Sequence, residues 1–310
     1  MQALFEVILP VFLVIGCGYG AVWRGLMTDE AIDALMRFAI NFAIPCLLFS
    51  AISTLDLSQD FNIPLLATYY SGAAAGFLAG LLGGRFLFGR GWEDAVVFGF
   101  CGLFSNTVLL GLPIMERAYG ADSLAANYAI IAIHAPFCYG VGVTAMEIIR
   151  ADGTSVLHTA GNVLKAMFRN VLVIGVGLGF IVNISSITQP AVLTDALALI
   201  TRAALPVALF GLGGVLVRYR PGGDVRAICY VAALSLVFHP AVVWGVGSAT
   251  GLEINDFRAA VVTAAMAPGI NCYIFASMYG AAQKVAASAV LLGTAASILT
   301  VWGWLAALGP

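Results

Sequence analysis

Charged residues are scarce in this sequence of 310 residues. Asp, Glu, Lys and Arg make up only 10% of it, and 61% is hydrophobic. A typical soluble domain carries about 25% charged residues. With so few charges the chain could not cover a water-facing surface, so its apolar excess must face lipid. The shortage excludes a soluble globular protein and predicts an integral membrane protein.

Catalytic and metal-binding motifs are also missing. HExxH, DDxxD and GxSxG do not occur, which leaves an intramembrane enzyme with little support. The cysteines lie in apolar runs without a CxxC or Cys/His cluster, so we expect them to be core residues. We expect no disulfides, no metal site and no cofactor. The net charge of −2 is spread over loops and indicates no nucleic-acid partner. The cysteines are Cys17, Cys46, Cys101, Cys138, Cys229 and Cys272.

Apolar stretches of about 20 residues, the length of a transmembrane helix, recur along the whole chain. They predict an all-α membrane protein with ten spans. The first stretch lacks the basic region and cleavage site of a signal peptide, so we expect it to be a span. The ten spans are 3–22, 31–54, 61–84, 94–118, 122–148, 166–184, 191–217, 226–250, 257–280 and 283–308.

Basic residues predict the orientation of these spans. Only Arg117 and Arg258 lie on the side reached by even-numbered spans, and Arg37 and Arg202 fall inside spans. Cytoplasmic loops carry the excess of Lys and Arg, so we expect odd-numbered connections in the cytoplasm and both termini outside. The residues that follow odd-numbered spans are Arg24, Arg85, Arg90, Arg150, Lys165, Arg169, Arg218, Arg220, Arg226 and Lys284.

The chain contains a weak internal repeat. AIPCLLFS at 43–50 in the second span resembles ALPVALFG at 204–211 in the seventh, and the fourth and ninth spans both end in Tyr-Gly. Chance similarity between apolar segments is the alternative. Five spans per half would invert the second half, as in many transporters. We therefore expect repeats at 1–148 and 166–310, joined by a cytoplasmic loop at 149–165.

Helix-breaking residues interrupt the fourth and ninth spans near their middles. Proline removes a backbone donor and glycine weakens the helix. Free backbone groups at bilayer depth are tolerated only where protein or a water-filled cavity satisfies them. The interruptions predict a midplane site where half-helix N-termini attract an anion and asparagine amides bind it. The expected site residues are Ser105, Asn106, Thr107, Gly111, Pro113, Pro268, Gly269 and Asn271.

The alternative is that these prolines only kink their helices and the asparagines only join neighbouring spans. No Asp or Glu occupies the middle of a predicted span, so sodium or proton coupling through a carboxylate has little support. Coupling to H+ or Na+ through a histidine or backbone carbonyls, or no coupling, stays open.

The segments RFAINFAIPCLLFSAIS, SNTVLLGLPIMERAYG and APGINCYIFASMYG resemble the auxin efflux carrier family, in particular its bacterial malonate or malate permeases. The resemblance covers essentially the whole chain. It implies ten spans in two inverted five-helix repeats, with broken helices 4 and 9 crossing, similar to the sodium/bile acid symporter fold. It implies a bacterial inner membrane protein, with scaffold spans 1, 2, 6 and 7 and transport spans 3–5 and 8–10.

The resemblance also implies roles for particular residues. It assigns Asn106 and Pro113, and Pro268, Gly269 and Asn271, to the two crossover segments. It adds Ile44, Pro45 and Cys46 as second-span residues that line the substrate pocket. A homodimer would form through the scaffold spans. The short loop between spans 5 and 6 argues against plant-type regulation, and the ninth-span sequence argues against auxin as substrate.

Three further residues at membrane depth have two interpretations each. Arg202, in the seventh span, should face a cavity because an arginine near the bilayer centre costs at least about 2.5 kcal/mol. It either binds a substrate carboxylate or forms a structural pair, for example with Asp195, or snorkels. His134 and His239 lie beside prolines, and each either relays protons or is a neutral core residue bonded to a carbonyl that the proline leaves free.

These observations favour a secondary transporter. It would move a small mono- or dicarboxylate, such as malonate or malate, by elevator-like motion of one domain against the other. A channel-like or receptor-like membrane protein is the alternative, and an intramembrane enzyme is less well supported.

Overall fold

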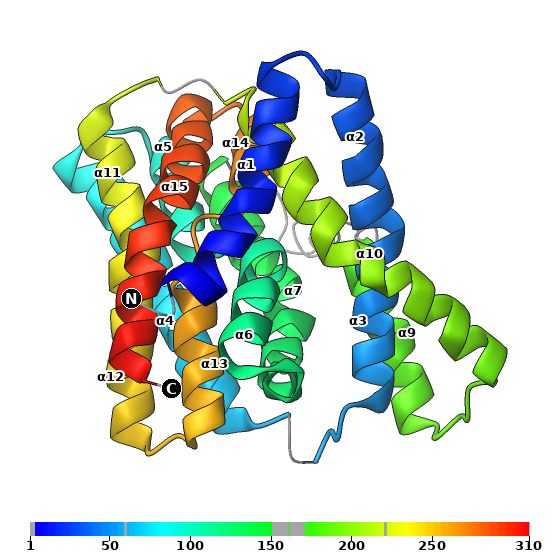
Figure 1. Cartoon of the computed structure of the whole chain (residues 1–310). Coiled ribbons are helices and arrows are strands. Elements are labelled where there is room, and N and C mark those ends of the chain that lie inside the picture. The colour runs from blue at the N-terminus through cyan, green and yellow to red at the C-terminus, as the bar shows by residue number, and fades with distance from the viewer. Residues whose placement is uncertain (1–3, 59–60, 151–160, 162–170, 220–221, 310) are drawn as a thin grey trace.

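Helices make up almost all of the chain that the computed structural model describes, residues 4–58, 61–150, 161, 171–219 and 222–309 (Figure 1). Within these ranges the one pairing between extended segments is the isolated bridge between Ser105 and Pro268. The all-helical prediction is confirmed. Most of the predicted loop at 149–165, with Lys165, and also Arg169 and Arg220, lies outside the described residues.

The first half of the chain runs from η1 to α7. Short π-helical turns continue or join several of its helices. Its elements are η1 (Leu4–Ile8), α1 (Leu9–Trp23), α2 (Asp29–Phe38), η2 (Ala39–Ala43), α3 (Ile44–Thr54), α4 (Ile63–Leu82), η3 (Gly83–Leu87), α5 (Trp92–Leu103), η4 (Thr107–Gly111), α6 (Leu112–Tyr119), η5 (Ala121–Ser123) and α7 (Leu124–Arg150).

The second half of the chain also contains long helices and one interrupted pair of shorter helices. Its elements are α9 (Val171–Ile184), α10 (Ala191–Leu216), α11 (Val225–Ala233), η6 (Leu234–Phe238), α12 (His239–Thr250), α13 (Ile254–Ala264), α14 (Ile270–Tyr279) and α15 (Gln283–Leu308).

Seven helical segments of the described chain are long and apolar enough to cross a membrane. They correspond to the predicted spans 1, 2, 3, 5, 7, 8 and 10, which confirms a multi-pass membrane protein. The segments are Leu4–Trp23, Asp29–Thr54, Ile63–Leu87, Ala121–Arg150, Ala191–Leu216, Val225–Thr250 and Gln283–Leu308.

Within the described residues, the other three predicted spans do not form continuous helices of that length. The fourth is divided into α5 and η4–α6, and the ninth into α13 and α14, because the chain leaves the helix at 104–106 and 265–269. The sixth is described only from Val171, as α9. Asn106, Pro268 and Gly269 lie at these breaks, whereas Gly111 and Pro113 lie within η4–α6, beyond the break of the fourth span.

Two groups of helices pack mainly within themselves. Helix α1 packs on α10 and α3 packs on α9, and α10 also contacts α2 and α3. In the other group α4 packs on α5 and α12, α5 on α7, and α14 on α15. Figure 1 shows α2, α3, α9 and α10 on one side of the molecule and α4, α11, α12, α13 and α15 on the other.

Glycine lets α1 and α10 approach until their backbones touch. A Cβ on Gly18 would overlap the carbonyl oxygen of Phe210, and one on Gly213 would overlap that of Ile15. Close backbone approach at small residues is how membrane helices gain packing energy, since burial from lipid supplies little. This contact therefore holds the α1–α10 pair together.

The expectation that the cysteines are core residues is only half right. Cys101, Cys138 and Cys272 are buried, but Cys17 and Cys229 are exposed and Cys46 is half-buried. A side chain that faces lipid needs the same apolar character as one in the core, so composition cannot separate the two positions.

We predict that Gly18→Ala destabilises the protein by about 1–3 kcal/mol, because the added methyl group forces the α1 and α10 backbones apart. Gly16→Ala is the matched control on the same helix, since nothing lies within 4 Å of its added Cβ. Thermal unfolding in detergent measures both. Equal melting temperatures for the two variants would contradict the packing argument.

Candidate functional site

The two helix breaks cross and satisfy each other's backbone. The N–H of Asn106 donates to the carbonyl of Ala267 at 2.8 Å, and the N–H of Gly269 donates to the carbonyl of Phe104 at 3.0 Å. These bonds flank the bridge between Ser105 and Pro268. In such a pair the two central residues need not bond to each other, so the missing N–H of proline costs nothing there. We call these paired segments, 104–106 and 267–269, the crossover.

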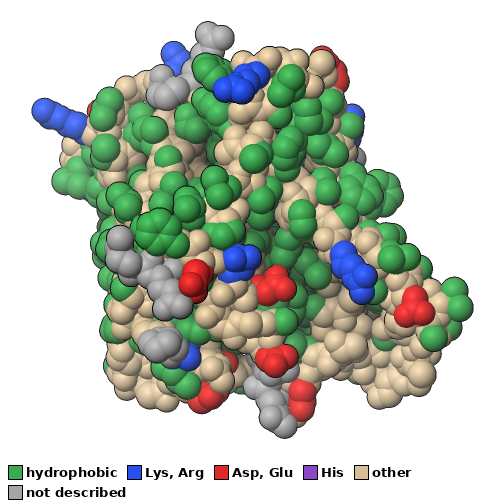
Figure 2. Space-filling model, viewed as in Figure 1, with side chains coloured by type: hydrophobic (Ala, Val, Ile, Leu, Met, Phe, Trp, Pro, Cys, Tyr) green, Lys and Arg blue, Asp and Glu red, His purple; other side chains and the backbone are tan. Residues whose placement is uncertain are grey.

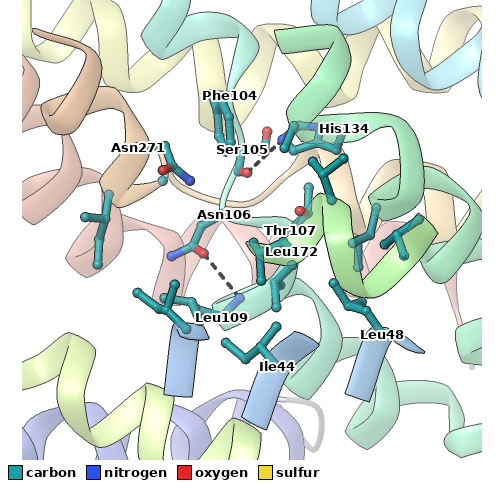
Figure 3. Close-up of a pocket in the computed structure, with 18 of the residues that line it drawn as sticks. Ile44, Leu48, Phe104, Ser105, Asn106, Thr107, Leu109, His134, Leu172 and Asn271 are labelled. Atoms are coloured by element: carbon teal, nitrogen blue, oxygen red, sulfur yellow. Dashed lines mark hydrogen bonds between the residues drawn. The ribbon is translucent and has the colours of Figure 1, made fainter. Parts of the chain in front are cut away.

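Asn106 places both ends of its amide at the crossover. Its Oδ1 accepts a hydrogen bond from the N–H of Leu109 at 3.3 Å and so caps the helix η4–α6. Its Nδ2 is buried without a partner among the described residues, and the residue is only 6% exposed. Figure 3 shows the amide nitrogen on the opposite side of the side chain from the bond to Leu109. An unused buried donor is costly unless a ligand or water completes it.

A cavity of about 160 Å³ lies against the crossover (Figure 3). Its walls come from η2 and α3, the segment 104–109, the middle of α7, the start of α9 and the start of α14. They are mainly apolar, with a few polar side chains, as in small-molecule sites. A cavity of roughly 150 Å³ can hold benzene, so this one suits a solute of a few heavy atoms.

A second asparagine faces this cavity from α14. Tyr139 donates from its hydroxyl to Oδ1 of Asn271 at 3.1 Å. This bond orients the amide and leaves Nδ2 of Asn271 without a partner among the described residues. Two helices, η4–α6 and α14, also begin at the cavity wall. The cavity therefore combines amide donors with the positive ends of two helix dipoles.

Two buried histidines contact Ser105 of the crossover. Nε2 of His134 lies 3.2 Å from the carbonyl oxygen of Ser105, and Nδ1 lies 3.4 Å from the hydroxyl of Tyr69. Since a carbonyl only accepts, Nε2 carries the proton, and a neutral ring then accepts from Tyr69. Nδ1 of His239 lies 3.2 Å from Oγ of Ser105. His134 therefore bonds a crossover carbonyl, and not one left free in its own helix beside Pro136.

The profile of a protein family described as membrane transport protein matches residues 3–305. The chain belongs to this family. This family includes auxin efflux carriers, so the resemblance inferred from the sequence motifs is confirmed. A member of this family is a transporter and not an enzyme.

Relatives align along nearly the whole membrane transport protein. It is 24% identical to the "Putative malonate transporter" of Rhizobium meliloti, over 98% of this chain and 96% of that one. It is 22% identical to the "Uncharacterized transporter YfdV" of Escherichia coli K12, over 96% and 95%. It is 22% identical to the "Probable auxin efflux carrier component 5b" of rice, over 93% and 92%.

Half of the predicted site residues lie at one cavity. Seven of them line it, namely Ile44, Ser105, Asn106, Thr107, His134, Gly269 and Asn271. Pro268 pairs in the crossover behind them, and Gly111 packs near Met266. Pro45, Cys46 and His239 do not line it.

Arg202 and Pro113, which were also expected at the substrate site, do not line this cavity with Asn106. Both line a separate cavity instead, because they lie further along α10 and α6 than the crossover reaches. The alternative that Arg202 pairs with Asp195 finds no ion pair among the described residues. The sequence analysis missed Tyr139 and Tyr69, which orient site residues but carry no signal in a single sequence.

We predict that His134→Leu lowers the free energy of unfolding by about 1–3 kcal/mol, because the buried carbonyl of Ser105 loses a donor. His134→Gln keeps an amide donor and should recover part of the loss. Thermal unfolding in detergent checks the order wild type, Gln, Leu. If the leucine variant is as stable as wild type, His134 does not hold the crossover.

Proposed function

We propose that this membrane transport protein is a secondary transporter of small mono- or dicarboxylates, such as malonate, which bind in the crossover cavity. The observation that carries the proposal is the unpartnered Nδ2 of Asn106, buried in a cavity of about 160 Å³ at a break in two helices. An anionic oxygen accepts strong hydrogen bonds from such donors. The printed name of the Rhizobium meliloti relative supports malonate as the first substrate to test.

The site contains no full positive charge among its described lining residues. Binding would instead depend on the amide nitrogens of Asn106 and Asn271 and on the dipoles of η4–α6 and α14. Such sites hold an anion without an ion pair, so release costs less than it would from a buried arginine. This suits a carrier, which must let go of its substrate in every cycle.

We further propose ten spans in two inverted five-helix repeats, 1–148 and 166–310, with both termini outside a bacterial inner membrane. The seven long helices, the two interrupted pairs and α9 support that count. Spans 1, 2, 6 and 7 would form a scaffold and the remaining spans a moving transport domain. The packing of α1 on α10 and of α3 on α9, apart from the α4–α5–α12 group, supports this division. A homodimer would form through the scaffold.

His134 and His239 are candidates for coupling proton movement to substrate transport, and their link to the substrate site would be Ser105 of the crossover. Their contacts with Ser105 support such a role, and the same contacts are also those of purely structural residues. Proton-coupled uptake would require a pH gradient to drive accumulation. Dependence on a pH gradient that His239→Gln abolishes would support coupling.

We predict that Asn106→Ser reduces malonate uptake, because serine keeps the helix cap but removes the amide donor. One hydrogen bond to a charged ligand contributes about 1.5–3 kcal/mol, so the KM should rise roughly 10- to 100-fold. Asn106→Ala, which also loses the cap, should abolish uptake while the protein still folds in detergent.

Counterflow of labelled malonate in proteoliposomes measures both variants. Saturable, counterflow-competent uptake by wild type supports a carrier, whereas conductance without saturation supports the channel alternative. Near-normal uptake by both Asn106 variants would remove Asn106 from the site.

A further inference from the structure

A second and larger cavity, of about 910 Å³, lies beside the crossover cavity. Its walls are the start of α1, one side of α6, the start of η5 and of α7, and the middle of α10, with one residue of α3. It therefore lies between the two groups of helices. Figure 2 shows a hollow in the surface between the main body of the molecule and the projecting part that α9 and α10 form in Figure 1, with basic and acidic side chains at its margin.

Arg202 gives this cavity a positive charge that is not paired with another described residue. It lies near the middle of α10, a helix of 26 residues, and is exposed. It has no hydrogen-bond or ion-pair partner among the described residues. A cation at that depth is expensive in lipid, so it should face water or a ligand.

The other charged residues of the cavity do not neutralise Arg202. Arg117 donates from its guanidinium to the backbone carbonyl of Glu6, with Nε at 3.1 Å. Glu116 is its neighbour on the same wall, and neither it nor Arg117 forms an ion pair with a described residue. Two cations therefore face one carboxylate, and the net positive charge favours an anion.

The two cavities are stacked along the same helices. On α7, Tyr128 lines the second cavity and Ile131 the crossover cavity, less than one turn away, roughly 5 Å along the helix. On the broken helix, Leu109 lines the crossover cavity and Pro113 the second one, again about one turn on. Helix α3 contributes to both. A solute that leaves one cavity along these walls enters the other.

We propose that the second cavity is a separate binding station for carboxylates on the transport path, and that Arg202 is the residue that attracts them. This inference rests on the proposed function, because it takes the crossover cavity as the transport site. Arg202 raises the local concentration of the anion next to that site without holding it during transport. The station would thus affect capture of the substrate more than its translocation.

Arg202→Gln tests this role. We expect the KM for malonate uptake to rise roughly two- to fivefold, the effect of one solvent-accessible charge, with kcat unchanged. The increase should shrink at high ionic strength, where the charge is screened. Arg202→Lys should stay within about twofold of wild type, since it keeps the charge.

Arg226→Gln is the matched control. The side chain of Arg226 is also exposed and without a partner among the described residues, but it lies on α11 outside both cavities. Its removal changes net charge equally and should leave KM unchanged. An unaltered KM in Arg202→Gln, or an equal rise in Arg226→Gln, would overturn the proposal.

A second measurement separates this station from the crossover site. In Thr201→Cys, on the wall of the second cavity, an anionic methanethiosulfonate reagent should react faster than its cationic analogue, above the background of the native cysteines. Malonate should slow the reaction, also when Asn106→Ala has abolished transport. If malonate no longer slows the reaction once Asn106→Ala is present, the second cavity holds no station of its own. Normal transport by the Asn106 variants would refute the crossover site while leaving the Thr201 result to stand alone.

Discussion

The structure depends on one requirement, that polar backbone groups at membrane depth must find partners. The chain meets it by breaking two helices at the same place and pairing the breaks, through the N–H of Asn106 and that of Gly269. The main features of the site follow from this pairing of the two breaks. The helices η4–α6 and α14 start there, the carbonyl of Ser105 is left for His134, and the Asn106 side chain caps one helix with its oxygen while its nitrogen stays unused.

The same crossover explains how a largely apolar protein can have a polar site without a buried charge. Amide nitrogens and helix dipoles supply a weak positive potential in a small cavity, and the charged Arg202 lies outside it, in the larger cavity. Under the proposed function, strong attraction would thus be kept away from the point where substrate is released. Close glycine contacts, such as Gly18 on Phe210, hold one group of helices together. The cavities lie where this group meets the other, which is where relative motion would open and close them.

Local chemistry determined which features could be predicted from sequence. Pro268 reveals the break in the ninth span because proline acts on its own backbone, and the polar Asn106 in the middle of an apolar span reveals the site in the fourth. Pro113 lies within the helix η4–α6 that follows the break. The position of Arg202 could not be predicted, since it depends on where α10 crosses the broken helix. The partner of His134 belongs to another span, and a proline two residues away suggested the wrong carbonyl. Cys17 and Cys229 were misplaced because lipid-facing and core positions share one composition.

The most direct test of this account is an experimental structure of the protein with malonate bound. The account predicts a carboxylate oxygen about 2.7–3.2 Å from Nδ2 of Asn106, in the cavity between the crossover, α3 and α7. Malonate bound elsewhere, with the Asn106 amide nitrogen still unpartnered, would contradict it.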